Sequence, residues 1–118
     1  MELEVGLEGQ VFFYEGKYYM LSNFSAHAIF LNGILYPTAE HAYQAQKFEQ
    51  QHVRLFISRV FSPLGAKRVA HGFREFYRQD WNDELKLKVM EEILRKKYRT
   101  HVEVQDALRL TGQAEIIE

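Results

Sequence analysis

The stretch from Pro37 to Phe48 constrains the fold of this chain most strongly, because it fixes where a helix can begin. Pro37 biases the residue before it toward an extended backbone and interrupts any helix that precedes it. The hydroxyl of Thr38 can accept a hydrogen bond from a free backbone N–H, so Thr38 is expected to be the N-cap. Alanine, glutamine and lysine, which favour helix, fill most of the following positions.

Several polar side chains share one face of this expected helix. Glu40, Gln44 and Lys47 follow the spacing i, i+4, i+7, and Tyr43 lies beside them. A stripe of this kind on a short helix is commonly a solvated surface. The alternative is a polar wall of a small-molecule site, in which the helix dipole favours a carboxylate anion in the first turn.

A β-hairpin is expected just before this helix. Asn32-Gly33 separates two apolar runs, residues 28–31 and 34–36, and a type I′ turn needs positive φ at both central positions. Residues 11–14, which are β-branched and aromatic, are a further short strand candidate, and so are residues 115–118. Residues 18–21 form a second apolar stretch.

Helices are expected to make up most of the remaining chain, over residues 51–61, 63–72, 81–98 and 102–110. Ser62-Pro63 has the form of an N-cap followed by the first helical residue. Asp80 is expected to cap the long helix, whose basic end suits the helix dipole, and Gly112 to close the last one. The predicted fold class is mainly α (α+β), one compact helical domain over residues 1–118 with short strands or a hairpin near its N-terminus.

Composition excludes several classes of protein. With 118 residues the chain has room for one core, and 15 basic against 16 acidic residues leave no footprint for nonspecific nucleic-acid or membrane-surface binding. The absence of cysteine excludes disulfides, zinc–thiolate sites and a cysteine nucleophile. No apolar run approaches the ~20 residues of a membrane span, and nothing resembles a signal peptide, so a cytoplasmic protein is expected.

The residue order in Pro37–Phe48 resembles the signature of the NADAR (YbiA-like) family, in which Pro-Thr-Ser/Ala-Glu-His leads into Gln-Ala-Gln-Lys-Phe. The resemblance runs in order from about Phe12 to Glu118. Shorter stretches that support it are Leu21-Ser22-Asn23-Phe24, Arg78-Gln79-Asp80-Trp81, Val89-Met90, Lys97-Tyr98 and Leu110-Thr111-Gly112.

Characterised members of that family are N-glycosidases, so the resemblance implies an enzyme. They cleave the bond between ribose C1 and nitrogen, either in ribosylamino-pyrimidine phosphates of riboflavin synthesis or in ADP-ribosylated guanine. The implied partner is therefore a small phosphorylated riboside or an ADP-ribosyl substrate, extending to ADP-ribosylated nucleic acid. No cofactor and no membrane partner are expected.

The resemblance also implies roles for individual residues. Glu40 would stabilise oxocarbenium charge at C1 or orient water. Lys47 would neutralise a phosphate or attack C1 of an opened sugar. The two catalytic candidates are thus Glu40 and Lys47. The substrate-binding candidates are Asn23, Phe24, His41, Gln44, Arg68, Arg78 and Trp81, with the arginines assigned to the 5′-phosphate and Trp81 to stacking.

Structural explanations stay open for several of these residues. Lys47 can pair with Glu40 or Glu49 on the helix surface. Trp81 can be a core or rim anchor, and Asn23 an ordinary turn residue. The chain's 5 histidines lack the paired spacing of a metal motif, so no metal site is expected.

Two other functions compete with catalysis. In the family an Asp-x-x-Trp-Gly segment, thought to carry an active-site aspartate, follows the position of Glu118, and this sequence does not contain it. A non-catalytic module that binds ADP-ribose or a related nucleotide is therefore the main alternative. A helical interaction domain without a small ligand is the third possibility, and the combination of Glu40, Lys47 and Trp81 argues against it.

Overall fold

The computed structural model describes residues 21–111 and confirms a mainly helical fold with a two-stranded hairpin. The elements in chain order are β1 (Ile29–Leu31), β2 (Ile34–Tyr36), α2 (Ala39–Ala45), α3 (Gln51–Ser58), α4 (Pro63–Gly72), the 3-10 turn η3 (Arg74–Phe76), α5 (Asp83–Thr100) and α6 (Val102–Thr111). The strands predicted over residues 11–14 and 115–118, most of the apolar stretch over 18–21, and the Gly112 cap lie outside the described residues.

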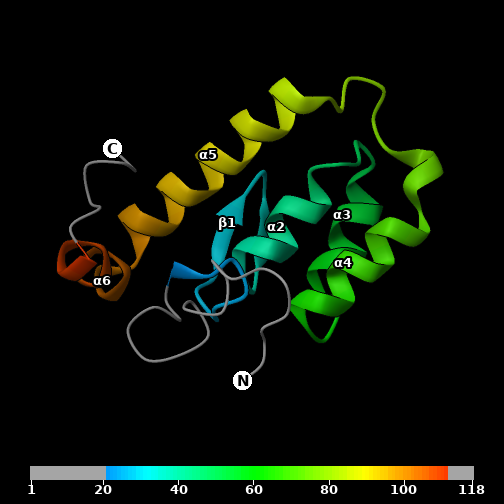
Figure 1. Cartoon of the computed structure of the whole chain (residues 1–118). Coiled ribbons are helices and arrows are strands. Elements are labelled where there is room, and N and C mark those ends of the chain that lie inside the picture. Colours follow the sequence, from blue (N-terminus) through cyan, green and yellow to red (C-terminus); the bar gives the residue numbers. More distant parts are fainter. Residues whose placement is uncertain (1–20, 112–118) are drawn as a thin grey trace.

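The long helix α5 runs along one side of the molecule (Figure 1). Beneath it lie the hairpin and α2, while α3 and α4 pack against α2 and against each other. Helix α6 follows the C-terminal end of α5 and packs against α5. Helix α2 therefore occupies the centre of the described fold, in contact with three helices and both strands.

The hairpin has the predicted turn. Asn32 and Gly33 have φ values of 51° and 84°, so both central residues adopt the left-handed conformation that a type I′ turn requires. The strands pair antiparallel, and their side chains alternate between the core and the solvent. The inward side chains are Ile29, Leu31, Ile34 and Tyr36.

Helix α2 begins as predicted and ends early. The Thr38 hydroxyl accepts the His41 N–H at 3.1 Å and caps the helix. The helix stops at Ala45, and the N–H of Lys47 bonds to the Gln44 carbonyl at 3.2 Å in the turn that follows. Lys47 therefore lies just beyond the helix whose face it was predicted to share.

The predicted cap of α5 is wrong. The Asn82 side chain accepts the Leu85 N–H at 2.8 Å, so α5 begins at Asp83 and not at residue 81. Asp80 is unavailable as a cap because its carboxylate oxygens accept two hydrogen bonds from the Arg78 guanidinium, at 2.6 and 3.0 Å. The predictions for the two preceding helices are closer to the structure. Helix α4 has Ser62 as its N-cap, as predicted. Helix α3 begins at Gln51 as predicted and ends at Ser58, three positions before its predicted end.

We predict that Thr38→Ala lowers the free energy of unfolding by about 1–2 kcal/mol, because it removes the N-cap of the central helix. It also removes the hydroxyl that lies 2.9 Å from Nδ1 of the buried His41. Thr38→Ser keeps the hydroxyl and serves as the control. Urea unfolding followed by circular dichroism measures the difference. Equal stability of Thr38→Ala and the unmodified chain would contradict the capping role.

Candidate active site

Glu40 is the best-supported centre of a site. It lies in the first turn of α2, its side chain is buried, and its Oε2 accepts a hydrogen bond from Gln44 Nε2 at 2.6 Å. Its backbone N–H donates to the Asn23 carbonyl at 2.9 Å. The buried part of the polar stripe, Glu40 and Gln44, is thus not a solvated surface. Glu40 is held in place by one hydrogen bond to its carboxylate and one from its backbone N–H.

Gln44 presents a second polar group beside this carboxylate. Its side chain is buried, and its Oε1 atom has no hydrogen-bond partner among the described residues. A buried acceptor without a partner is costly in a folded protein. The amide oxygen is therefore available to a donor on a ligand, such as a sugar hydroxyl.

Lys47 is held between aromatic rings. Its ammonium lies 5.4 Å from the centre of the Tyr43 ring and 5.1 Å from that of Tyr77, within the range of a cation–π interaction. Burial lowers the pKa of Lys47, the Glu40 carboxylate opposes that change, and the positive charges of Lys86 and Lys67 add to it.

Lys67 and Lys86 are site candidates that the sequence analysis missed. They come from α4 and α5, two helices that both pack against α2, and both act electrostatically on Lys47. Both lysines are exposed, and Lys86 also pairs with Asp83 at 3.7 Å. The positive charge around Lys47 favours an anionic ligand. Only the packing of the helices brings these lysines together, so no local motif marks them.

Trp81, a predicted stacking residue, packs against Tyr43. Its ring centre is 5.6 Å from that of Tyr43, with an angle of 60° between the rings. Burial raises the pKa of the Tyr43 hydroxyl, and the Glu40 carboxylate adds to the effect. Two aromatic side chains of intermediate burial thus lie beside a buried carboxylate and a lysine.

The turn that contains Asn23 and Phe24 packs against the start of α2. Asn23 contributes its backbone carbonyl to Glu40, and its Nδ2 lies 3.7 Å from the sulfur of Met90 on α5. The Phe24 N–H donates to the Ser22 hydroxyl at 3.0 Å. Asn23 is therefore adjacent to Glu40 mainly through its backbone.

The other predicted binding residues lie in different surroundings. His41 is buried, with Nδ1 2.9 Å from the Thr38 hydroxyl and Nε2 2.9 Å from the Val60 carbonyl, and burial lowers its pKa. Arg78 donates its backbone N–H to the Lys47 carbonyl at 2.7 Å, while its guanidinium binds Asp80. Arg68 is exposed on α4, and no contact within the described residues joins it to Glu40. The binding roles of these three residues stay predictions.

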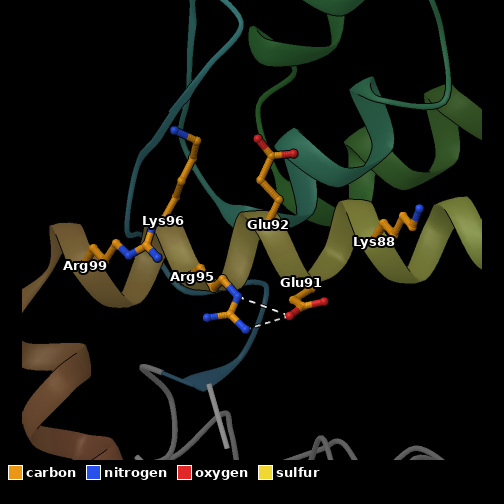
Figure 2. Close-up of a pocket in the computed structure, with 6 residues that line it drawn as sticks. All are labelled: Lys88, Glu91, Glu92, Arg95, Lys96 and Arg99. Carbon is orange, nitrogen blue, oxygen red and sulfur yellow. Dashed lines mark hydrogen bonds and ion pairs between the residues drawn. The ribbon is translucent and has the colours of Figure 1, made fainter. Parts of the chain in front are cut away.

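Two surface depressions elsewhere have a different chemistry. One, of about 380 Å³, lies along α5, where Figure 2 shows charged side chains of both signs projecting from successive turns and Arg95 paired with Glu91. The other, of about 610 Å³, is apolar. Its lining residues are Phe48, Gln50, His52, Val53, Phe56, Phe73 and Phe76. Neither combines an isolated carboxylate with lysines and aromatic rings as the Glu40 group does.

Two further findings, on metal ions and on membranes, concern residues 21–111 alone. No group of three or more histidine, aspartate or glutamate side chains in this range is placed to hold a metal ion. No helix in the range is long and apolar enough to cross a membrane.

The sequence is similar to those of several named proteins. The chain is 38% identical over 97 residues to the N-glycosidase YbiA of Escherichia coli, covering 82% of this chain and 60% of that protein. It is 32% identical over 113 residues to an N-glycosidase of Nostoc punctiforme, covering 92% and 72%. It is also 31% identical over 114 residues to a riboflavin biosynthesis protein of Vibrio vulnificus, covering 95% and 31%.

The fold agrees with these relatives. The NMR structure of the E. coli protein YbiA matches with a TM-score of 0.71 and 37% identity, covering 83% of this chain and 58% of that chain. The chain thus spans about 60% of the length of the E. coli relative. The model of the NADAR domain family matches residues 12–118. The chain therefore belongs to the NADAR domain family.

Proposed function

We propose that this domain is an N-glycosidase that hydrolyses the bond between ribose C1 and nitrogen in a phosphorylated riboside. One observation carries the proposal: the buried Glu40 carboxylate, bonded to Gln44, acts electrostatically on Tyr43 and Lys47, and Trp81 packs against Tyr43. The names of the E. coli and Nostoc relatives support the same reaction class.

Glu40 has the properties that this reaction needs. As the C1–N bond breaks, its electron pair leaves with the nitrogen and positive charge develops on C1 and the ring oxygen. A carboxylate already fixed in place stabilises that charge without reorganisation. The same carboxylate can accept the proton of the water whose oxygen bonds to C1, and the departing nitrogen takes up a proton.

The surrounding groups suit the rest of a phosphorylated riboside. Lys47, with Lys67 and Lys86 nearby, offers positive charge to a phosphate. The Oε1 of Gln44, which has no partner within residues 21–111, can accept a hydrogen bond from a ribose hydroxyl. The Trp81 and Tyr43 rings offer a surface on which a flat base can stack. Arg68 and Arg78 remain predicted phosphate ligands.

For the substrate we propose two candidates. One is a ribosylamino-pyrimidine phosphate, and the other is ADP-ribosylated guanine, either free or in nucleic acid. The name of the Vibrio relative, a riboflavin biosynthesis protein, supports the former. The alternative function, a non-catalytic module that binds ADP-ribose, is favoured by groups that can bind a nucleotide without reacting: the Lys47 cation for a phosphate and the Trp81 and Tyr43 rings for a base.

We predict that Glu40→Gln lowers release of the free base by about 100-fold or more, because it removes the fixed negative charge. Ligand affinity should change little, since Lys47 and Trp81 remain. Chromatography after incubation with each candidate substrate measures release, and the fluorescence of Trp81, the only tryptophan, measures ADP-ribose binding. Glu49→Gln, an exposed neighbour, is the matched control.

Two outcomes would contradict the glycosidase assignment. Unchanged release in Glu40→Gln would remove the carboxylate from the chemistry. No release by the unmodified chain, together with saturable ADP-ribose binding, would support the binding module.

Lys47 provides a second prediction, which concerns binding. Lys47→Met should raise KM about tenfold or more, and Lys47→Arg should restore most of the affinity, because the cation is what a phosphate needs. Affinity should fall as pH rises through the lowered pKa of Lys47, at a lower pH than for an ordinary lysine. Borohydride trapping of a substrate adduct on Lys47 would contradict this role and assign Lys47 as a nucleophile.

A further inference from the structure

Lys97, in the last turn of α5, is a buried charge that the proposed reaction does not use. Its side chain is only 2% exposed, and no carboxylate among the described residues pairs with it. Its ammonium donates to the Ser22 carbonyl at 2.6 Å and to the Ser25 hydroxyl at 2.7 Å. Lysines are rarely buried, because removing the charge from water is costly. Burial lowers the pKa of Lys97 to about 8.

The two acceptors of Lys97 lie at the two ends of one tight turn. The Ser25 N–H donates to the Ser22 carbonyl at 3.1 Å, and the Phe24 N–H donates to the Ser22 hydroxyl at 3.0 Å. Lys97 therefore joins both ends of this turn to α5. The residues it connects are 72 and 75 positions away along the chain, so the contact links distant segments.

This turn also holds the backbone of Glu40. The Asn23 carbonyl, inside the turn, accepts the Glu40 N–H at 2.9 Å, and the Asn23 side chain reaches Met90 on α5. A continuous series of contacts thus runs from the Lys97 ammonium through the turn to the first turn of α2.

We propose that Lys97 is a positioning residue for Glu40, holding the Ser22–Ser25 turn so that the Asn23 carbonyl fixes the start of α2 and the direction of the carboxylate. The inference rests on the proposed function of Glu40. Lys97 does not act on substrate itself, because its buried ammonium is bonded to the Ser22 carbonyl and the Ser25 hydroxyl. The Ser25 hydroxyl, which lies 2.8 Å from His27 Nδ1, is engaged by Lys97 in the same way, so we do not assign the two as a nucleophilic pair.

The test uses Lys97→Met, which keeps most of the length of the side chain and removes the ammonium. We expect turnover to fall about tenfold or more, because small displacements of a catalytic group are costly, while ADP-ribose affinity changes less than about threefold. Amide hydrogen exchange at Glu40 should accelerate by about tenfold or more, with Ala42 unchanged. Ala42 N–H bonds to the Thr38 carbonyl and serves as the internal control. Lys88→Met, exposed on the same helix, is the matched variant.

A second variant keeps the test decisive if Lys97→Met does not fold. Ser25→Ala removes one of the two acceptors and should give smaller changes in the same direction. Unchanged exchange at Glu40 in the folded variants would overturn the proposal, as would an equal loss of affinity and turnover. If the unmodified chain releases no base, the proposed function fails, and the exchange measurement still decides whether Lys97 positions Glu40.

Discussion

The burial of helix α2 is the constraint on which the rest of the structure depends. A helix of 7 residues is unstable alone, so its neighbours must hold it in place. Ala39, Ala42 and Ala45 are fully buried, and their small side chains let helices and strands approach α2 closely. The polar residues between these alanines are therefore buried as well, and Glu40 and His41 obtain their partners from within the fold.

This burial separates two kinds of polar residue on one short helix. His41 uses both ring nitrogens for contacts within the fold, so it stabilises the packing of α2 against the segment after α3. Glu40 and Gln44 bond mainly to each other, and Gln44 keeps a buried acceptor without a partner among residues 21–111. In the proposed reaction, the fixed carboxylate and the amide oxygen beside Lys47 act as preorganised groups, since electrostatic interactions strengthen where water is excluded.

Local chemistry explains which features the sequence predicted. The turn at Asn32-Gly33 and the caps at Thr38 and Ser62 depend on residues within a few positions, and all three are confirmed. The cap of α5 was misassigned to Asp80. The Asp80 carboxylate is hydrogen-bonded to the Arg78 guanidinium, and Asn82, two positions later, caps the helix instead. Lys67 and Lys86 escaped prediction because α4 and α5 approach Lys47 only through tertiary packing. The sequence analysis treated Lys97 as one of several basic residues at the end of α5 that suit the helix dipole. Its neighbours in the sequence do not show that Lys97 is buried while other lysines of α5 are exposed.

The most direct test of the central claim is an NMR titration of the ¹⁵N-labelled chain with ADP-ribose. The claim is that the Glu40 face of α2 is the ligand site. The predicted result is a saturable change in the amide signals of Glu40 and Gln44 and in the indole N–H of Trp81. Changes confined to the charged face of α5 between Lys88 and Arg99, or to the groove lined by phenylalanines, would contradict it.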